Sequence, residues 1–429
     1  MGLPQQARRS TTTTSANGTH NFTVKATDAN GCTGTRAYTL TVGCPSITVN
    51  PATLPIATAG VPFAQTFAQT GGSGAIAWSV SAGALPNGMT LNASTGALSG
   101  MSPIRGVFSF TIKATDANGC FGTRSLTFNI RPKAKADFDG DGKSDLSVWT
   151  GATGNWMVSN SGNNQVQNLI WGAGYEPYND VIVPGDYDGD GKADQAIWRG
   201  ADSIWYIRKS SDGQPILQLY GTSNAPYFDI PTPGDFDGDG KTDLAVWRRD
   251  GTWFVRRSSD NTNLIVTHGQ NGDVPIAADY DGDGKCDFAV FRPAAVAPAP
   301  NWFILQSSTN TVLALQWGAG YAPFLDVPVP VDYDGDGKAD LAIWRGADSV
   351  WYIRPSANPN APILQLWGTS NAPYFDIPTP ADYDGDGKAD IAVWRRDGTW
   401  FVLRSSNNTY QIVTHGQQGD VPVTAKGVW

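Results

Sequence analysis

The sequence is poor in glutamate, histidine and long apolar runs, and each shortage narrows the possible folds. Its 429 residues contain 39 aspartates and glutamates together, and only one of these, Glu176, is a glutamate. Helix-rich proteins use glutamate freely, whereas aspartate favours turns, helix caps and hard metal ions. No run of about 18 apolar residues occurs, so the sequence predicts no membrane-spanning helix.

Residues for catalysis and for nucleic-acid binding are also scarce. Charged residues make up 16% of the chain, the net charge is −9 and there is no basic stripe, which argues against a nucleic-acid partner. With 3 histidines, 4 cysteines and one glutamate, the chain shows no Ser/His/Asp or Cys/His set for nucleophilic catalysis. We therefore expect no enzyme, no catalytic residues and no site for an organic cofactor.

The abundant residues are those of short strands and turns. Hydrophobic residues reach 40% and aromatics 11%, which is enough to bury a core. The 49 glycines and 28 prolines follow no collagen period, and there are 16 tryptophans, a composition that favours many short strands joined by turns. The sequence therefore predicts an all-β protein, with about three domains at roughly 150 residues per domain.

A repeat of 88 residues organises the N-terminal third of the chain. The stretch Phe22–Cys32 returns nearly unchanged as Phe110–Cys120, each time with an Asn-Gly turn and a following alternating strand, which is a hairpin signal. Short strands separated by Gly, Pro and Asn turns precede the second copy, as in a β-sandwich. We predict a complete Ig-like sandwich at residues 44–131 and, at residues 1–43, only the last hairpin of a truncated one.

A second repeat, with steps of 49, 49, 44, 53 and 50 residues, fills residues 132–429. Each copy has one short strand before the motif Asp-x-Asp-Gly-Asp-Gly-Lys-x-Asp and three strands after it. Four short antiparallel strands per repeat of this length indicate a propeller blade. Residues 222–233 also recur at 369–380, so three blades look duplicated, which favours six blades.

The end of the chain leaves the number of blades open. Residues 420–426 align with residues 273–279, but Lys426 stands where the motif would begin with an aspartate. This last strand either pairs with the first blade and closes a six-bladed ring, which we favour, or it starts a seventh blade.

The six nonapeptides have the composition of calcium loops. Ca²⁺ takes about six to eight oxygen ligands. Aspartates at positions 1, 3, 5 and 9 supply carboxylates, glycine at position 6 permits the sharp turn, and lysine at position 7 offers its backbone carbonyl. The predicted ligands are Asp137, Asp139, Asp141, Lys143 and Asp145; Asp186, Asp188, Asp190, Lys192 and Asp194; Asp235, Asp237, Asp239, Lys241 and Asp243; Asp279, Asp281, Asp283, Lys285 and Asp287; Asp332, Asp334, Asp336, Lys338 and Asp340; and Asp382, Asp384, Asp386, Lys388 and Asp390.

Position 12 distinguishes these loops from EF-hands. An EF-hand needs glutamate there, whereas the six loops have valine or isoleucine in a predicted strand. We therefore expect strand–loop–strand sites for about six Ca²⁺ ions, because Mg²⁺ demands octahedral geometry and keeps its waters. Bound cations would also relieve the repulsion between clustered carboxylates.

Two family resemblances follow from these motifs. Residues 132–429 resemble the FG-GAP/VCBS-repeat calcium-binding β-propellers, whose blades are similar to those of the integrin α-subunit head; the six loops, the Ala-Val-Trp-Arg strands and the Trp-Gly turns carry the resemblance. Residues 44–131 resemble the putative-Ig (cadherin-like) modules of bacterial surface proteins through Ala84–Leu91 and Gly96–Gly100. The resemblance implies Ig-like sandwiches followed by a calcium-binding propeller.

The cysteines and histidines have structural interpretations. In an Ig-like module the hairpin that carries Cys120 would lie near the entry strand at Cys44, so we favour a Cys44–Cys120 disulfide over free thiols. Cys286 replaces a small residue in the fourth loop. His268 and His415 stand where other blades have tryptophan or tyrosine, and we interpret them as aromatic substitutes and not as metal ligands.

The repeated tryptophans and arginines allow two interpretations. Pairs such as Trp198 and Trp205 are more often core between packed blades than a stacking surface for sugars. The alternative is that exposed tryptophans, with arginines such as Arg199 and Arg248, form repeated glycan pockets. The aspartates before each blade, such as Asp229, are expected to cap turns.

These observations together favour an extracellular or cell-surface protein in which Ig-like units act as a stalk and the calcium-loaded propeller binds a glycan or protein. The first residues lack the apolar segment of a signal peptide, and we expect the chain to be a truncated piece of an exported protein. The alternatives are a polysaccharide-active enzyme or its non-catalytic module, and a purely structural scaffold.

Overall fold

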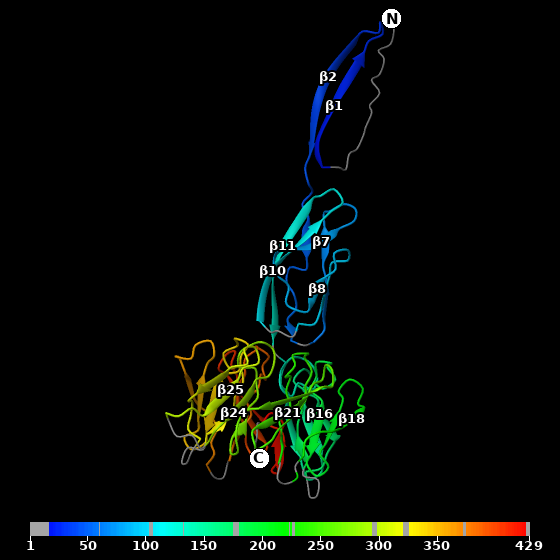
Figure 1. Cartoon of the computed structure of the whole chain (residues 1–429). Coiled ribbons are helices and arrows are strands. Elements are labelled where there is room, and N and C mark those ends of the chain that lie inside the picture. The colour runs from blue at the N-terminus through cyan, green and yellow to red at the C-terminus, as the bar shows by residue number, and fades with distance from the viewer. Residues whose placement is uncertain are drawn as a thin grey trace. The chain divides into compact units, whose positions relative to one another are not determined.

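The structure is a computed structural model that describes residues 17–59, 61–102, 106–131, 133–174, 180–222, 224, 228–293, 298–320, 326–371 and 375–425. Strands are the regular elements throughout these residues (Figure 1), so the all-β prediction is confirmed. None of the described residues belongs to a helix long and apolar enough to cross a membrane. The chain divides into two compact units, one of Met1–Pro55, Phe63–Gly100 and Val107–Phe128, the other of Ile56–Pro62, Met101–Gly106 and Asn129–Trp429.

A long hairpin opens the chain and a sandwich follows it. In the hairpin, β1 (Gly18–Thr27) pairs antiparallel with β2 (Thr33–Val42) and with no other described strand. The sandwich strands form sheets of order β4-β11-β10-β7, β5-β9-β8 and β3-β6. Their bounds are β3 Thr48–Asn50, β4 Ala57–Thr58, β5 Phe63–Thr66, β6 Ala68–Thr70, β7 Ala77–Gly83, β8 Met89–Leu91, β9 Ala97–Gly100, β10 Gly106–Thr115 and β11 Phe121–Arg131.

A disulfide and a small apolar core hold the sandwich together. Cys44 and Cys120 are joined, with their Cα atoms 5.4 Å apart, which is the pair favoured from the sequence, while Cys32 is free and exposed. Leu98, Ile112 and Phe128 are fully buried, because β9, β10 and β11 alternate inward and outward side chains along a pleated strand.

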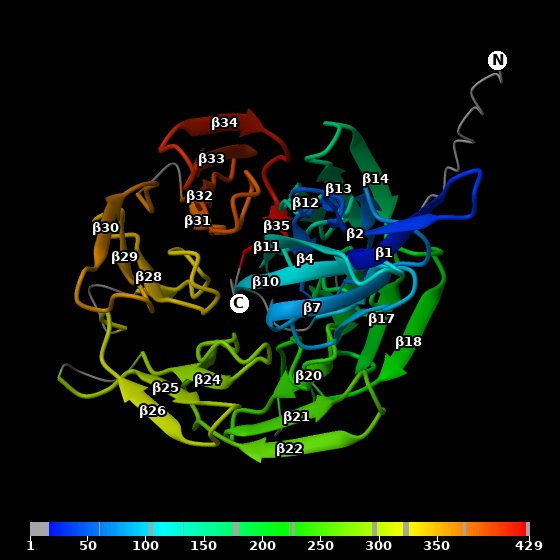
Figure 2. The same ribbon diagram turned by 90° about the horizontal axis from the view of Figure 1, so that it is seen from above.

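The second unit contains six sheets of four strands each, which lie around a common centre (Figure 2). In the first sheet the order is β14-β13-β12-β35, and in the other five it follows the chain. The bounds are β12 Leu146–Thr150, β13 Asn155–Ser159, β14 Val166–Ile170, β15 Asp180–Ile182, β16 Gln195–Arg199, β17 Ile204–Arg208, β18 Pro215–Leu219, β19 Ile230–Pro231, β20 Leu244–Trp247, β21 Thr252–Arg256, β22 Asn263–Thr267, β23 Val274–Pro275, β24 Phe288–Phe291, β25 Trp302–Leu305, β26 Val312–Leu315, β27 Val327–Pro328, β28 Leu341–Arg345, β29 Val350–Arg354, β30 Ile363–Leu366, β31 Ile377–Pro378, β32 Ile391–Trp394, β33 Thr399–Leu403, β34 Tyr410–Thr414 and β35 Asp420–Pro422.

The two ends of this unit meet in one blade. The C-terminal strand β35 pairs antiparallel with β12, with Val148 opposite Pro422 and Thr150 opposite Asp420. The last described strand therefore completes the sheet of the first blade, as the ring-closing alternative expects, and does not begin another sheet among the described residues.

Burial within a blade explains the sequence pattern of its strands. The second strand is buried on both faces, as in Leu244–Trp247 of β20, and the third strand alternates, with Trp253 and Val255 fully buried. The outer strand exposes alternate apolar side chains, such as Ile265 of β22. The second and third strands lie between neighbouring blades, and this position demands apolar residues on both faces.

Candidate functional site

The second to sixth aspartate-rich loops begin shortly after the first strand of their blades, whereas the first loop has no described strand of its own blade before it, because β35 supplies that strand from the C-terminus. In the third blade the Asp235 carboxylate accepts the N–H groups of Gly238 and Gly240 at 2.6 and 2.9 Å. Both glycines have left-handed φ angles, 80° and 86°, which side-chain-bearing residues rarely adopt. The same two hydrogen bonds recur at Asp137, Asp186, Asp279, Asp332 and Asp382.

The aspartate at position 9 anchors the loop to the blade. Asp243 is fully buried; one carboxylate oxygen accepts the Phe236 N–H at 2.8 Å and the other accepts the Ser258 N–H at 2.7 Å. Phe236, at position 2, packs against Trp253 with ring centroids 6.2 Å apart. Each carboxylate oxygen keeps a second lone pair, so this anchored aspartate can still bind a cation.

Three of the four predicted aspartates converge in each of five loops. Six groups of at least three metal-ligating side chains among the described residues have ligand atoms within 4.8 Å of one another. Five of these groups are Asp137, Asp139 and Asp145; Asp186, Asp188 and Asp194; Asp235, Asp237 and Asp239; Asp279, Asp281 and Asp287; and Asp332, Asp334 and Asp336. The backbone carbonyls of the position 7 lysines remain predicted ligands.

The protein alone stabilises the ionised form of these carboxylates poorly. Burial, reinforced by neighbouring carboxylates, raises the pKa of Asp137 and Asp235 to about 7 and that of Asp194 and Asp243 to about 6. A divalent cation among them would remove this penalty, because an opposite charge favours the ionised form. The oxygen-only donor set suits a hard cation of the calcium class, so the residues present fit such an ion.

A second set of residues around the loops was missed by the sequence analysis. In the turn between the third and fourth strands, Ser258 Oγ donates to Asp239 at 2.9 Å and Ser259 Oγ donates to Asp237 at 2.6 Å. Hydroxyl or amide donors occupy the same places in the other blades, at Ser161 and Gly162, Ser210 and Ser211, Ser307 and Ser308, Ser356 and Ala357, and Ser405 and Ser406. The signal was available, since Ser-Ser recurs at this point of four blades.

Backbone hydrogen bonds connect each loop to the next. The N–H at position 8 of one loop donates to the carbonyl at position 1 of the preceding loop, as from Ala193 to Asp137 at 2.7 Å. The other pairs are Thr242 to Asp186, Cys286 to Asp235, Ala339 to Asp279, Ala389 to Asp332 and, across the closure, Ser144 to Asp382. The six loops therefore form a continuous ring at one end of the blades.

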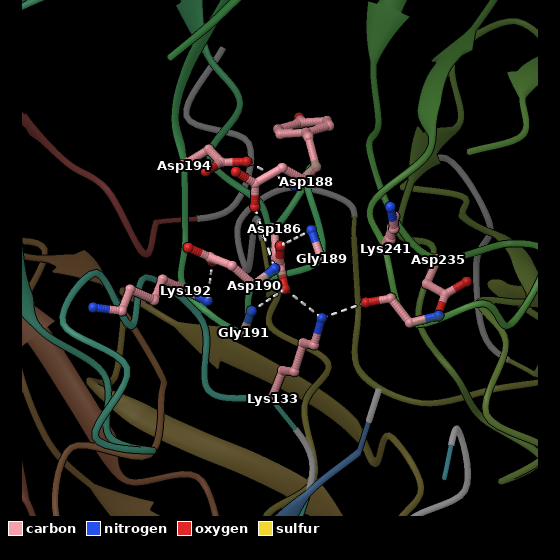
Figure 3. Close-up of polar contacts among 12 residues, drawn as sticks. Lys133, Asp186, Asp188, Gly189, Asp190, Gly191, Lys192, Asp194, Asp235 and Lys241 are labelled. Atoms are coloured by element: carbon pink, nitrogen blue, oxygen red, sulfur yellow. Dashed lines mark hydrogen bonds and ion pairs between the residues drawn. The ribbon is translucent and has the colours of Figure 1, made fainter. Parts of the chain in front are cut away.

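Lys133 contacts both the second and the third loop. Its Nζ lies 2.5 Å from Oδ2 of Asp186 and also contacts the carbonyl oxygen of Gly240 in the third loop (Figure 3). These residues line a central cavity of about 550 Å³ to which several of the loops contribute. The ammonium group of Lys133 thus already interacts with one carboxylate oxygen of the second loop.

Family models match both units of the chain. The FG-GAP-like repeat model matches residues 137–197, 235–290 and 332–393, and the Putative Ig domain model matches residues 45–131. The chain therefore contains FG-GAP-like repeats and an Ig-like domain. No curated protein matches it.

Solved structures resemble this FG-GAP-repeat protein only distantly. A Bacteroides thetaiotaomicron protein of unknown function is 10% identical, with 86% of this chain and 98% of that one covered and a TM-score of 0.37. The Dos1 propeller is 12% identical, with 72% and 82% covered and a TM-score of 0.35. A Bacteroides fragilis protein described as a putative alpha-galactosidase/melibiase is 26% identical over 20% of this chain, which spans 18% of that protein, with a TM-score of 0.18. At these TM-scores the likeness carries no functional information.

The opposite end of the FG-GAP blades is held by buried ion pairs. Arg248 donates to both carboxylate oxygens of Asp229 at 2.8 and 3.1 Å, and its guanidinium lies over the ring of Phe254 at 4.4 Å. Matching pairs are Arg199 with Asp180, Arg292 with Asp273, Arg345 with Asp326 and Arg395 with Asp376. In the first blade Thr150 takes the arginine's place and donates to Asp420 at 2.6 Å.

These contacts confirm the favoured interpretation of the repeated tryptophans as core and rule out the alternative in which they form glycan pockets with the arginines. Trp198, Trp205 and Trp253 are 3%, 0% and 0% exposed, so they are core between the blades. Arg199 and Arg248 are committed to buried carboxylates. The aspartates expected to cap turns do accept loop amides, as Asp229 does from Thr222 N–H at 2.9 Å, but their ion pairs were not foreseen.

The two propeller histidines are aromatic substitutes, as predicted. A ring nitrogen of His268 lies 3.0 Å from the carbonyl of Phe303, and one of His415 lies 3.0 Å from that of Met157. Trp171, Trp317 and Trp367 donate their indole N–H to the matching carbonyl of the next blade at 3.0, 3.0 and 3.1 Å. The aromatic side chain at this position therefore links neighbouring blades by a hydrogen bond, and His415 makes this link between the last blade and the first.

Proposed function

We propose that this FG-GAP-repeat protein is an extracellular, calcium-binding recognition and adhesion protein whose propeller presents a surface to a glycan or protein ligand. The observation that carries the proposal is the convergence of three carboxylates in each of five loops among the described residues. Calcium loops of low affinity with oxygen-only ligands suit the millimolar calcium of extracellular fluids.

The chain's own residues do the binding and positioning. Bound Ca²⁺ supplies positive charge that offsets the clustered carboxylates. Asp235, Asp237, Asp239 and Asp243 would hold the ion in the third loop, and Ser258 and Ser259 orient these carboxylates through hydrogen bonds. Because each loop donates a hydrogen bond to the preceding one, ions in the ring stiffen one end of every blade and leave the other end for a ligand.

The Ig-like domain is consistent with this location. Cys44 and Cys120 form a disulfide, and disulfides persist mainly in oxidising compartments outside the cytosol. The proposal assigns no reaction to the chain.

The test combines metal counting with ligand arrays. The full chain is dialysed against calcium or against chelator, its bound calcium is counted, and both forms are applied to glycan and extracellular-protein arrays. The proposal expects bound calcium and a ligand that is captured only in the calcium form. Absence of bound calcium, or no capture by folded calcium-loaded protein, would overturn it.

A further inference from the structure

Two exposed phenylalanine–arginine pairs lie at the end of the blades opposite the aspartate-rich loops. Phe228 precedes β19 and Asp235 follows it, so the two residues belong to opposite ends of that strand. The Arg249 guanidinium lies 5.5 Å from the ring centroid of Phe228, and Arg396 lies at the same distance from Phe375. Both arginines are exposed, and the rings are 44% and 45% exposed.

Both phenylalanines are held in an unfavourable backbone conformation. Their φ angles are 47° and 48°, and every other described non-glycine residue with a positive φ is alanine, asparagine or serine. A bulky residue in the left-handed region is strained, and such strain concentrates at binding sites. The strain is maintained by the loop, because Asp229 N–H donates to the Thr222 carbonyl at 2.9 Å and the Asp229 carboxylate accepts the Thr222 N–H.

The arginine of each pair has no part in the ion pairs that hold the blade. Arg248 and Arg395 bind the buried aspartates, whereas the next residues, Arg249 and Arg396, pair with no acidic side chain of the described structure. The second and fifth blades have glycine at these positions, Gly200 and Gly346. The additional arginine is thus unnecessary for building a blade.

We propose that the Phe228–Arg249 and Phe375–Arg396 pairs are two binding sites for an acidic polysaccharide that bears carboxylates or sulfates on its repeating unit. The inference rests on the proposed function and names its ligand class. A guanidinium stacked on a ring still directs its N–H fork at a carboxylate or sulfate, and the exposed ring offers an apolar surface to the sugar. Two copies on one propeller suit a ligand that itself repeats, because linked sites gain avidity.

The experiment measures binding of the full, calcium-loaded chain to defined polymers. Polygalacturonate tests carboxylates and dextran sulfate tests sulfates, with neutral dextran and polyglutamate as comparison polymers. We expect Arg249→Ala/Arg396→Ala to weaken binding to the preferred acidic polysaccharide about tenfold or more, as expected from loss of charge-assisted hydrogen bonds. The matched control, Lys25→Ala/Arg36→Ala, removes two positive charges from exposed residues of β1 and β2, where Arg36 also stacks on an aromatic ring, Tyr38, and should bind as wild type does.

A second variant separates binding from folding. Phe228→Asn/Phe375→Asn removes the rings and supplies a residue that tolerates the left-handed region. We expect an unchanged or higher melting temperature together with weaker binding. A lower melting temperature with unchanged binding would show that the rings are structural and would overturn the inference.

The remaining outcomes distinguish this inference from the proposed function. Equal binding by wild type and by the double arginine variant, or equally tight binding of dextran or polyglutamate, would overturn the acidic-polysaccharide sites. If the chain instead captures a neutral glycan or a protein in calcium, the proposed function stands and this inference fails. If it captures nothing, both fail.

Discussion

Lys133 Nζ lies 2.5 Å from Oδ2 of Asp186, the first carboxylate of the second aspartate-rich loop. The same ammonium contacts the Gly240 carbonyl of the third loop. A cation entering the second loop must therefore displace or tolerate this positive charge.

Replacing Lys133 should strengthen metal binding in one loop only. We expect Lys133→Gln to raise calcium affinity at the second loop about tenfold or more, because removing a like charge from beside the ion lowers the electrostatic cost of binding. Calorimetric titration of the variant should then show that one calcium site binds more tightly than in wild type. Lys135→Gln is the control, since Lys135 lines the same cavity without an ion pair to any described acid; an equal effect of both variants would contradict the prediction.

Calcium should stabilise the propeller. The clustered carboxylates lose their repulsion when the cation binds, and a single site saturated about 100-fold above its Kd contributes roughly 2.7 kcal/mol to the free energy of unfolding. We expect a higher melting temperature in calcium than in chelator, with a smaller shift in magnesium. Equal melting temperatures in calcium and in chelator would count against metal binding by these loops.

The serines in the turns between the third and fourth strands should influence the calcium affinity of the loops. Asp237 accepts the Ser259 hydroxyl at 2.6 Å, whereas in the fifth blade Ala357 offers only its amide to Asp334, at 3.1 Å. Ser259→Ala should weaken the third site about tenfold, the usual scale for losing a group that orients a ligand. The reciprocal variant Ala357→Ser should tighten the fifth site, and unchanged titrations of both variants would refute the role.

The Arg–Asp pairs should matter for stability. Asp229 has a fully buried side chain, so Arg248→Met would leave an unpaired buried charge and cost about 3–5 kcal/mol in the free energy of unfolding. Arg249→Met, one residue away and exposed, should cost no more than about 0.5 kcal/mol. Urea unfolding of both variants measures the difference, and similar losses would disprove the distinction.

His415 should contribute a pH dependence at the ring closure. Burial lowers the pKa of His415 below its usual 6.5, opposed by the Met157 carbonyl and by Asp420. Because the folded pKa lies below the unfolded one, this residue's contribution is fully present above pH 6.5 and is lost as the pH falls below it. The variant His415→Trp introduces the residue that Trp171 and Trp367 supply in the same slot, and its unfolding free energy should fall less between pH 7.5 and about 5.5. Equal slopes in wild type and variant would exclude the effect.

The aspartate-rich loops were predictable because their geometry is local. Asp235 and Asp243 each accept a backbone N–H of the same nonapeptide, and glycines at fixed places permit the turn. Strand order within a blade was predictable for a similar reason, since short connections make consecutive strands neighbours. The Cys44–Cys120 pairing also followed from the sequence, but only through the expected sandwich.

The sequence by itself therefore determined the all-β class, the repeated blades and the acidic loops, all of which depend on local spacing and on alternation of apolar residues. Only the tertiary structure decided that Arg248 pairs with Asp229, that Ser259 reaches Asp237, that Lys133 reaches Asp186 and that Arg249 stays free to stack on Phe228. These contacts join different strands, loops or blades, so they depend on strand register and on closure of the ring, which no single segment encodes.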